Sequence, residues 1–94
     1  MPAYLVCYTL KKQKNYPLLW NALKGWNMVR VLDSTWVGTL VGPAATIRDL
    51  LLNYVDADDD IVVIELKPGM QWASRASRTN PGVAYLVRNF PSYP

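Results

Sequence analysis

The sequence predicts a single α+β domain in which amphipathic helices alternate with apolar strands. Its 94 residues are close to the usual size of one domain, so we treat residues 1–94 as one unit. Hydrophobic residues make up 51% of the chain and charged residues 18%, which leaves enough apolar material to offset the entropy of ordering. Along the chain, apolar residues at helical spacing alternate with short runs of branched and aromatic residues.

Three segments have the composition of β-strands. Residues 3–10 (AYLVCYTL) and 61–66 (IVVIEL) are apolar at nearly every position, as in strands that are covered on at least one face. Residues 28–41 favour an extended chain because valine recurs there, but they exceed the usual strand length of ~5–6 residues. We therefore expect a break near Asp33 that gives two strands. A single long, bent strand is the alternative.

Three further segments carry an apolar stripe along one helical face. The first covers residues 16–26, the second follows Gly42-Pro43, and the third opens at Asn80-Pro81. The stripes have the spacing i, i+3, i+4 and i+7, and they consist of Tyr16, Leu19, Trp20 and Leu23, then Ile47, Leu50, Leu51 and Tyr54, then Val83, Leu86, Val87 and Phe90.

The predicted order, βαββαβ followed by a C-terminal helix, is that of a ferredoxin-like fold. Two helices would cover one face of the sheet and leave the other face open, and a domain this small cannot readily spare an apolar open face. We expect Tyr4, Tyr8 and Trp36 to lie on that face and to form the interface of a homodimer. The alternative is a monomer whose C-terminal helix folds over the open face.

The composition excludes several kinds of catalytic site, metal site and membrane segment. The chain has no histidine, which removes histidine-based triads and histidine–metal sites. Its one cysteine, Cys7, lies within a predicted strand and has no histidine to activate it, so we expect a core residue. No apolar run approaches the ~18 residues of a membrane span, and the N-terminus lacks the pattern of a secretory signal. We expect a cytoplasmic protein with no cofactor and no membrane partner.

Five segments occur in the order YLVCYTL, WNALKGW, VRVLDSTWVGTL, IRDLLLNYV and DDDIVVIEL. Together they resemble the small ferredoxin-like proteins related to the second CRISPR-associated protein and the VapD toxins, and more closely their SinR-like relatives. The resemblance covers roughly residues 2–66. Its most specific part is residues 32–36 (LDSTW), followed by a glycine and the helix that contains Ile47, Arg48 and Asp49.

The resemblance implies a dimer that associates with nucleic acid or with a defence complex. In the family, a carboxylate at the end of the first strand, paired across the dimer, is understood to hold a divalent metal for RNA or DNA cleavage. This chain has Thr9 there, and a hydroxyl is a poor ligand for a hard divalent ion. Asp33 is a weak catalytic candidate as a displaced carboxylate, and its alternative role is to stabilise a turn. Whether the chain is an enzyme stays open here, although the missing carboxylate argues against catalysis.

Charge is distributed unevenly along a chain whose net charge is +3. Residues 49–66 hold six acidic residues and no basic one, whereas the segments on either side are basic. Arginine beside a planar aromatic residue is a recurring way to hold bases and phosphates. The candidate nucleic-acid-binding residues are therefore Lys11, Lys12, Lys14, Trp72, Arg75 and Arg78. The alternatives are a solvated corner for the lysines and a loop in which Trp72 is tucked against the edge of the core.

Three functions follow as hypotheses. The leading one is a non-catalytic homodimer that binds RNA or DNA, or docks onto a nucleoprotein complex. The second is a protein-interaction module, such as a small phage or mobile-element inhibitor, because aromatic residues and arginine are enriched at protein contacts. The third is a metal-dependent endoribonuclease that uses Asp33.

Overall fold

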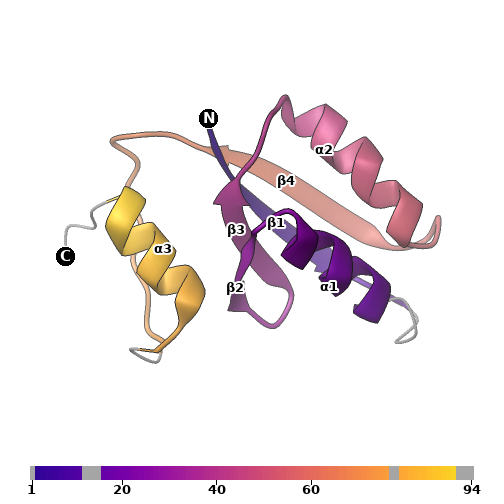
Figure 1. Ribbon diagram of the computed structural model, residues 1–94, viewed down its shortest axis with the longest axis horizontal. Coiled ribbons are helices and arrows are strands. Elements are labelled where there is room, and N and C mark those ends of the chain that lie inside the picture. Colours follow the sequence, from indigo (N-terminus) through magenta and orange to yellow (C-terminus); the bar gives the residue numbers. More distant parts are fainter. Residues whose placement is uncertain (1, 12–15, 77–78, 91–94) are drawn as a thin grey trace.

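A four-stranded antiparallel sheet with helices on both sides makes up the fold (Figure 1). The computed structural model describes residues 2–11, 16–76 and 79–90. The strands lie in the order β2-β3-β1-β4. The predicted α+β class is confirmed, and the arrangement is compatible with a ferredoxin-like fold. Along the chain the elements are β1 (Ala3–Thr9), α1 (Tyr16–Gly25), β2 (Val29–Leu32), β3 (Thr35–Thr39), α2 (Ala44–Leu51), the 3-10 helix η2 (Leu52–Tyr54), β4 (Asp60–Leu66) and α3 (Pro81–Asn89).

The break predicted near Asp33 is confirmed, because Asp33 and Ser34 form a two-residue turn between β2 and β3. The turn contains neither glycine nor an Asn-Gly pair, which two-residue hairpin loops usually need. Contacts from β1 hold it: the Tyr8 amide donates to the Ser34 carbonyl (3.1 Å), and the Tyr8 hydroxyl donates to the Asp33 carbonyl (3.4 Å). The pairing of β2 with β3 also shifts register between Arg30 and Leu32, as at a β-bulge.

The larger part of the core lies between the sheet and the helices α1 and α2. Strand β1 alternates: Tyr4, Val6 and Tyr8 are buried on this inner side, whereas Leu5 and Cys7, which point to the outer side, are half-buried. The helices contribute the buried residues Leu19, Leu23, Ile47 and Leu51.

The prediction that Tyr4, Tyr8 and Trp36 lie on an open face is wrong. Their exposed fractions are 3%, 4% and 2%, and all three pack into the core that α1 and α2 cover. Trp36 pairs directly with Val6 in the antiparallel register, so it shares the inner face with the even-numbered positions of β1. The homodimer stays a prediction, but an interface between copies has to use other residues.

Helix α3 covers the outer face of the sheet over β2 and β3, on the side opposite to α1 and α2 (Figure 1). Asn80 opens the helix as predicted, because its Oδ1 accepts from the Val83 amide (2.9 Å); its Nδ2 donates to the Val31 carbonyl (2.7 Å). The helix approaches β2 closely because residue 82 is glycine, where an added Cβ would lie 2.6 Å from the Val31 Cα. A second, smaller core cluster results, formed by Ala3, Val37, Leu86 and Phe90.

One part of the outer face stays uncovered, because α3 packs on β2 and β3 rather than on β4. Val62 and Ile64 of β4 are 54% and 47% exposed, and their register partners on β1, Cys7 and Leu5, are half-buried. We refer to these four residues as the outer strip. The C-terminal helix thus folds over part of the open face, as in the monomer alternative, and an apolar strip remains beside it.

Helix α1 ends at Gly25, one residue before the end of the predicted segment 16–26, and the residue that turns the chain is Asn27. Asn27 has a φ of 60°, in the left-handed region that asparagine tolerates better than most residues. The Asn27 amide donates to the Lys24 carbonyl (2.9 Å), and the Met28 amide donates to the Leu23 carbonyl (3.1 Å). These are the paired bonds of a Schellman motif, and they direct Met28 into the core.

Replacing Leu19 or Leu51 by alanine should lower the free energy of unfolding by ~2–5 kcal/mol, because both side chains are fully buried and truncation leaves a cavity. Each has a matched control on the same helix, since Leu18 is 56% exposed and Leu50 is 49% exposed. Their replacement by alanine should change the free energy of unfolding by about 0.5 kcal/mol or less. Urea unfolding followed by circular dichroism compares the four variants. Equal losses within a pair would contradict the assigned helix faces.

Candidate functional site

The structure does not bring the predicted nucleic-acid-binding residues together. Lys11 follows the end of β1, whereas Trp72 packs into the cluster that contains Ala3, at the start of the same strand. Arg75 is exposed in the segment between β4 and α3. The remaining three candidates, Lys12, Lys14 and Arg78, lie outside the described residues, so their assignment stays a prediction.

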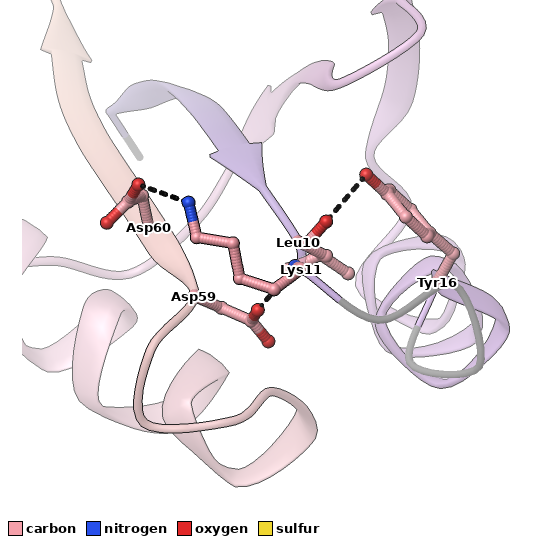
Figure 2. A network of polar contacts seen from close by, with 5 residues as sticks. All are labelled: Leu10, Lys11, Tyr16, Asp59 and Asp60. Atoms are coloured by element: carbon pink, nitrogen blue, oxygen red, sulfur yellow. Dashed lines mark hydrogen bonds and ion pairs between the residues drawn. The ribbon is translucent and has the colours of Figure 1, made fainter.

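Lys11 is engaged in holding two strand ends together (Figure 2). Its ammonium lies 3.6 Å from the Asp60 carboxylate, and its backbone amide donates to the Asp59 carboxylate (2.7 Å). The same Asp59 side chain accepts from the Asp56 amide (2.7 Å), which closes the turn before β4. The acidic run therefore organises a turn and partly neutralises Lys11, so this lysine is a weaker candidate for a phosphate contact.

Trp72 has the packing role that we weighed as its alternative. It is half-buried against the second core cluster, and its Nε1–H donates to the Phe90 carbonyl at the end of α3. A buried indole generally needs a hydrogen-bond acceptor for its N–H, and the acceptor of the Trp72 N–H lies within the protein. The structure favours a role for Trp72 in fastening α3 to the sheet.

Asp33, the weak catalytic candidate, lies exposed in the β2–β3 turn, where its carbonyl accepts from Tyr8. Thr9 ends β1 and pairs in register with Asp60 of β4. Within the described part of the chain, no three histidine, cysteine, aspartate or glutamate side chains gather in a way that could hold a metal ion. The turn-stabilising role of Asp33 agrees with this placement, and a displaced catalytic carboxylate stays a prediction.

A pocket of about 570 Å³ lies between the start of α1 and the β2–β3 hairpin. Ligand pockets commonly measure ~300–1,000 Å³, so this volume suits a small organic ligand. We refer to it as the Arg30 pocket; its lining consists of Tyr16, Pro17, Trp20, Arg30, Asp33 and Ser34. The lining combines one cation, aromatic surfaces and polar groups, and these come from a helix and a hairpin that are separate in the sequence.

The hydroxyl of Tyr8 organises the aromatic side chains around this pocket. It accepts hydrogen bonds from Trp20 Nε1 (2.8 Å) and Trp36 Nε1 (2.9 Å), and it donates to the Asp33 carbonyl (3.4 Å). A phenol hydroxyl has one donor and two acceptor lone pairs, so these three bonds use its full capacity. Two indoles and the hairpin turn are thus held in one geometry before any ligand arrives.

Arg30 is held by aromatic rings instead of by a carboxylate. Its guanidinium carbon lies 4.5 Å from the centroid of the Trp20 ring and 4.9 Å from that of Trp36. Such cation–π contacts stabilise a cation by ~0.5–2 kcal/mol, depending on how far it is desolvated. Its Nε is shielded from solvent without a hydrogen-bond partner, and no carboxylate among the described residues forms an ion pair with Arg30. The pocket therefore contains a positioned positive charge that forms no ion pair within the described part of the chain.

Tyr16 and Trp20 provide a further aromatic surface in the same pocket. Their ring centroids are 5.6 Å apart, and their planes are inclined by 47°. The Tyr16 hydroxyl donates to the Leu10 carbonyl (3.4 Å), which anchors the ring to the end of β1 (Figure 2). Tyr16 also begins α1, and the positive partial charge of a helix N-terminus adds to the attraction for an anion.

Arg30 is a candidate site residue that sequence reasoning missed. The available signal was a lone basic residue inside the extended, valine-rich run of residues 28–41. Trp20 and Trp36 were expected in the core or at a dimer face, and nothing in the sequence pairs them with Arg30. That pairing depends on the register of a bulged hairpin, in which Arg30 lies opposite Trp36.

Tyr8→Phe should lower the free energy of unfolding by about 1–3 kcal/mol, because the buried Trp36 N–H loses its acceptor. Tyr85→Phe is the matched control: it removes a hydroxyl whose hydrogen bond to Thr39 (2.6 Å) is exposed to solvent. The control should cost about 0.5 kcal/mol or less. Urea unfolding measures both variants, and equal losses would show that the Tyr8 hydroxyl does not organise the aromatic cluster.

Comparison with known proteins adds no relative. No protein-family model matches the chain, and no curated protein matches it. Among the described helices, none is long and apolar enough to cross a bilayer.

Proposed function

We propose that this protein is a non-catalytic, ferredoxin-like nucleic-acid-binding protein whose contact site is the Arg30 pocket. The observation that carries the proposal is the Arg30 guanidinium, which lies against two indole rings and has no acidic partner among the described residues. Proteins that bind single strands combine cations that meet phosphates with aromatic rings on which bases stack. The resemblance to small ferredoxin-like proteins of defence systems supports the same class of partner.

The proposed nucleic-acid contact is the Arg30 pocket, instead of Lys11 and the segment between β4 and α3. Trp72 has its N–H bonded to Phe90, and Lys11 is paired with Asp60, so both already serve the fold. Arg30 serves the fold less directly, because its charge is not needed to neutralise an acid. The chain's net charge of +3 adds a weak general attraction for a polyanion.

No catalytic step is part of the proposal. The pocket lining has a single carboxylate, that of Asp33, and the chain has no histidine that could complete an acid–base pair. A hydroxyl such as that of Ser34 would need a base to become a nucleophile, and the lining offers no histidine or lysine. Binding is therefore the activity that this set of side chains supports best.

Binding of a labelled single-stranded oligonucleotide, measured by fluorescence anisotropy across a salt series, tests the proposal. The affinity should fall linearly on a log–log plot as salt rises, because phosphate contacts release counterions. Arg30→Met keeps the apolar stem and removes the cation, so it should weaken binding at least about tenfold, as expected for loss of a charged contact. It should also flatten the salt slope by ~0.7, the value for one phosphate contact of a single strand.

The matched control is Arg88→Met, because Arg88 is an exposed arginine on α3, across the sheet from the pocket. This control should leave the affinity within about twofold, since it removes only general charge at the surface. Unfolding curves of both variants confirm that each is folded. An affinity that does not change with salt concentration would refute the Arg30 pocket as the nucleic-acid contact. Equal weakening of oligonucleotide binding by Arg30→Met and Arg88→Met would refute it as well.

A second candidate function, a self-association module, is favoured by the outer strip. Leu5, Cys7, Val62 and Ile64 carry no charge, and the two β4 residues are about half exposed. Contiguous apolar surface of this kind marks interaction sites in soluble proteins. A second copy suits it, because a two-fold axis places the same patch on both sides and an uncharged apolar patch complements itself. This is the homodimer that the sequence predicts, with a different set of interface residues.

Ile64→Lys should convert such a dimer into a monomer, because a two-fold axis brings two added charges close together on the strip. Leu18→Lys is the control, since Leu18 is similarly exposed but lies on α1, on the other side of the sheet. Sedimentation equilibrium over a concentration series measures the association of the parent and both variants. A parent chain that stays monomeric throughout, or an Ile64→Lys variant that still dimerises, would rule out the outer strip as the interface.

A further inference from the structure

Building on the proposed function, we infer that the Arg30 pocket binds one unstacked nucleotide unit with a single phosphate. This unit is either a free nucleoside monophosphate or one residue of a single strand, and the two share the same chemistry. A cavity of about 570 Å³ suits a ligand of that size. In a duplex the bases are paired and stacked inside, so only an unpaired residue can present its ring to the aromatic wall.

The aromatic wall accounts for the base. Because Tyr16 and Trp20 are inclined by 47°, a flat ring that stacks on Tyr16 lies tilted, at that same inclination, to the ring of Trp20. Stacking of a base on an aromatic side chain contributes ~1–3 kcal/mol and tolerates any base. The Trp20 N–H is already donated to Tyr8 and the Arg30 guanidinium lies over its ring, so Trp20 offers no hydrogen bond that would select a base.

Arg30 accounts for the phosphate. Its guanidinium is positioned by the two indoles, so little side-chain entropy remains to be lost when a ligand binds. A planar guanidinium matches the oxygens of a phosphate, and such charge-assisted bonds are stronger than neutral ones. The start of α1 contributes positive potential at the same pocket, and the first turn of this helix contains no acidic residue.

Asp33 is the reason why we expect the pocket to prefer a ligand with a single phosphate. This acidic residue belongs to the same lining, and like charges placed close together disfavour a ligand that brings further negative groups. The same carboxylate and the Ser34 hydroxyl can accept hydrogen bonds from a ribose hydroxyl or from an exocyclic amine. A nucleoside monophosphate should therefore bind more tightly than the corresponding triphosphate, which is the reverse of the order that an arginine alone would give.

Titration with small nucleotides tests the inference, with quenching of tryptophan fluorescence and isothermal titration calorimetry as two readouts. Adenosine monophosphate and uridine monophosphate should both bind the parent protein, and adenosine triphosphate, adenosine and inorganic phosphate should each bind more weakly. Arg30→Met should weaken monophosphate binding at least about tenfold. Asp33→Asn should raise the affinity for the triphosphate more than that for the monophosphate, because the triphosphate carries more negative charge, and should thereby remove the preference for the monophosphate. If Arg30→Met fails to fold, the ratio of the triphosphate affinity to the monophosphate affinity still tests the inference in Asp33→Asn, because Asp33 lies in an exposed turn.

Competition with a labelled single strand separates this inference from the proposed function. If a strand binds through Arg30 but adenosine monophosphate neither binds nor competes, the single-nucleotide inference is overturned and nucleic-acid binding stands. If the monophosphate binds and no strand does, the proposed function fails and the pocket is a site for free nucleotides. Monophosphate binding that Arg30→Met leaves unchanged, or a duplex that competes as well as the single strand, would also overturn the inference.

Discussion

The hydroxyl of Tyr8 is the interaction on which the rest of this structure depends. It lies under the helices and has three hydrogen bonds: it accepts one from each of two indoles and donates one to the turn of the β2–β3 hairpin. A buried hydroxyl with all its bonding capacity in use rigidifies its surroundings, because every partner that moves leaves a polar group unsatisfied. Strand β1, helix α1 and the hairpin are thus tied at one atom, and the Arg30 pocket is built from the groups around that atom.

The two faces of the sheet are covered by helices to different extents, and this difference determines which surfaces remain accessible to a partner. Helices α1 and α2 cover the inner face, where Tyr4, Tyr8 and Trp36 pack into the core. The outer face is closed only over β2 and β3, where Gly82 lets α3 approach the sheet. The outer strip, on β1 and β4, and the Arg30 pocket, at the edge of the inner layer, both stay accessible. The apolar outer strip and the cationic Arg30 pocket are therefore placed on different sides of the same strands.

The cationic surface differs from a usual basic patch because Arg30 is restrained by aromatic rings. An exposed lysine loses rotamer freedom when it meets a phosphate, whereas a stacked guanidinium has lost much of that freedom already. Lys11 illustrates the contrast, since it is bound to acidic side chains and holds two strand ends together. Restraint, more than the number of charges, favours the pocket as the proposed contact with nucleic acid in a chain of modest net charge.

The sequence by itself determined the α+β class, the order of the elements, the break near Asp33 and the opening of α3 at Asn80, because each depends on local spacing, capping or chain reversal. It did not determine which face Tyr4, Tyr8 and Trp36 occupy, and it did not single out Arg30. Tertiary structure decided both, through the β1–β3 register, a bulge beside Arg30 and the docking of α3 on the outer face. The physical reason is that alternation shows which side chains share a face, whereas only packed helices decide which face is buried and which residues meet across it.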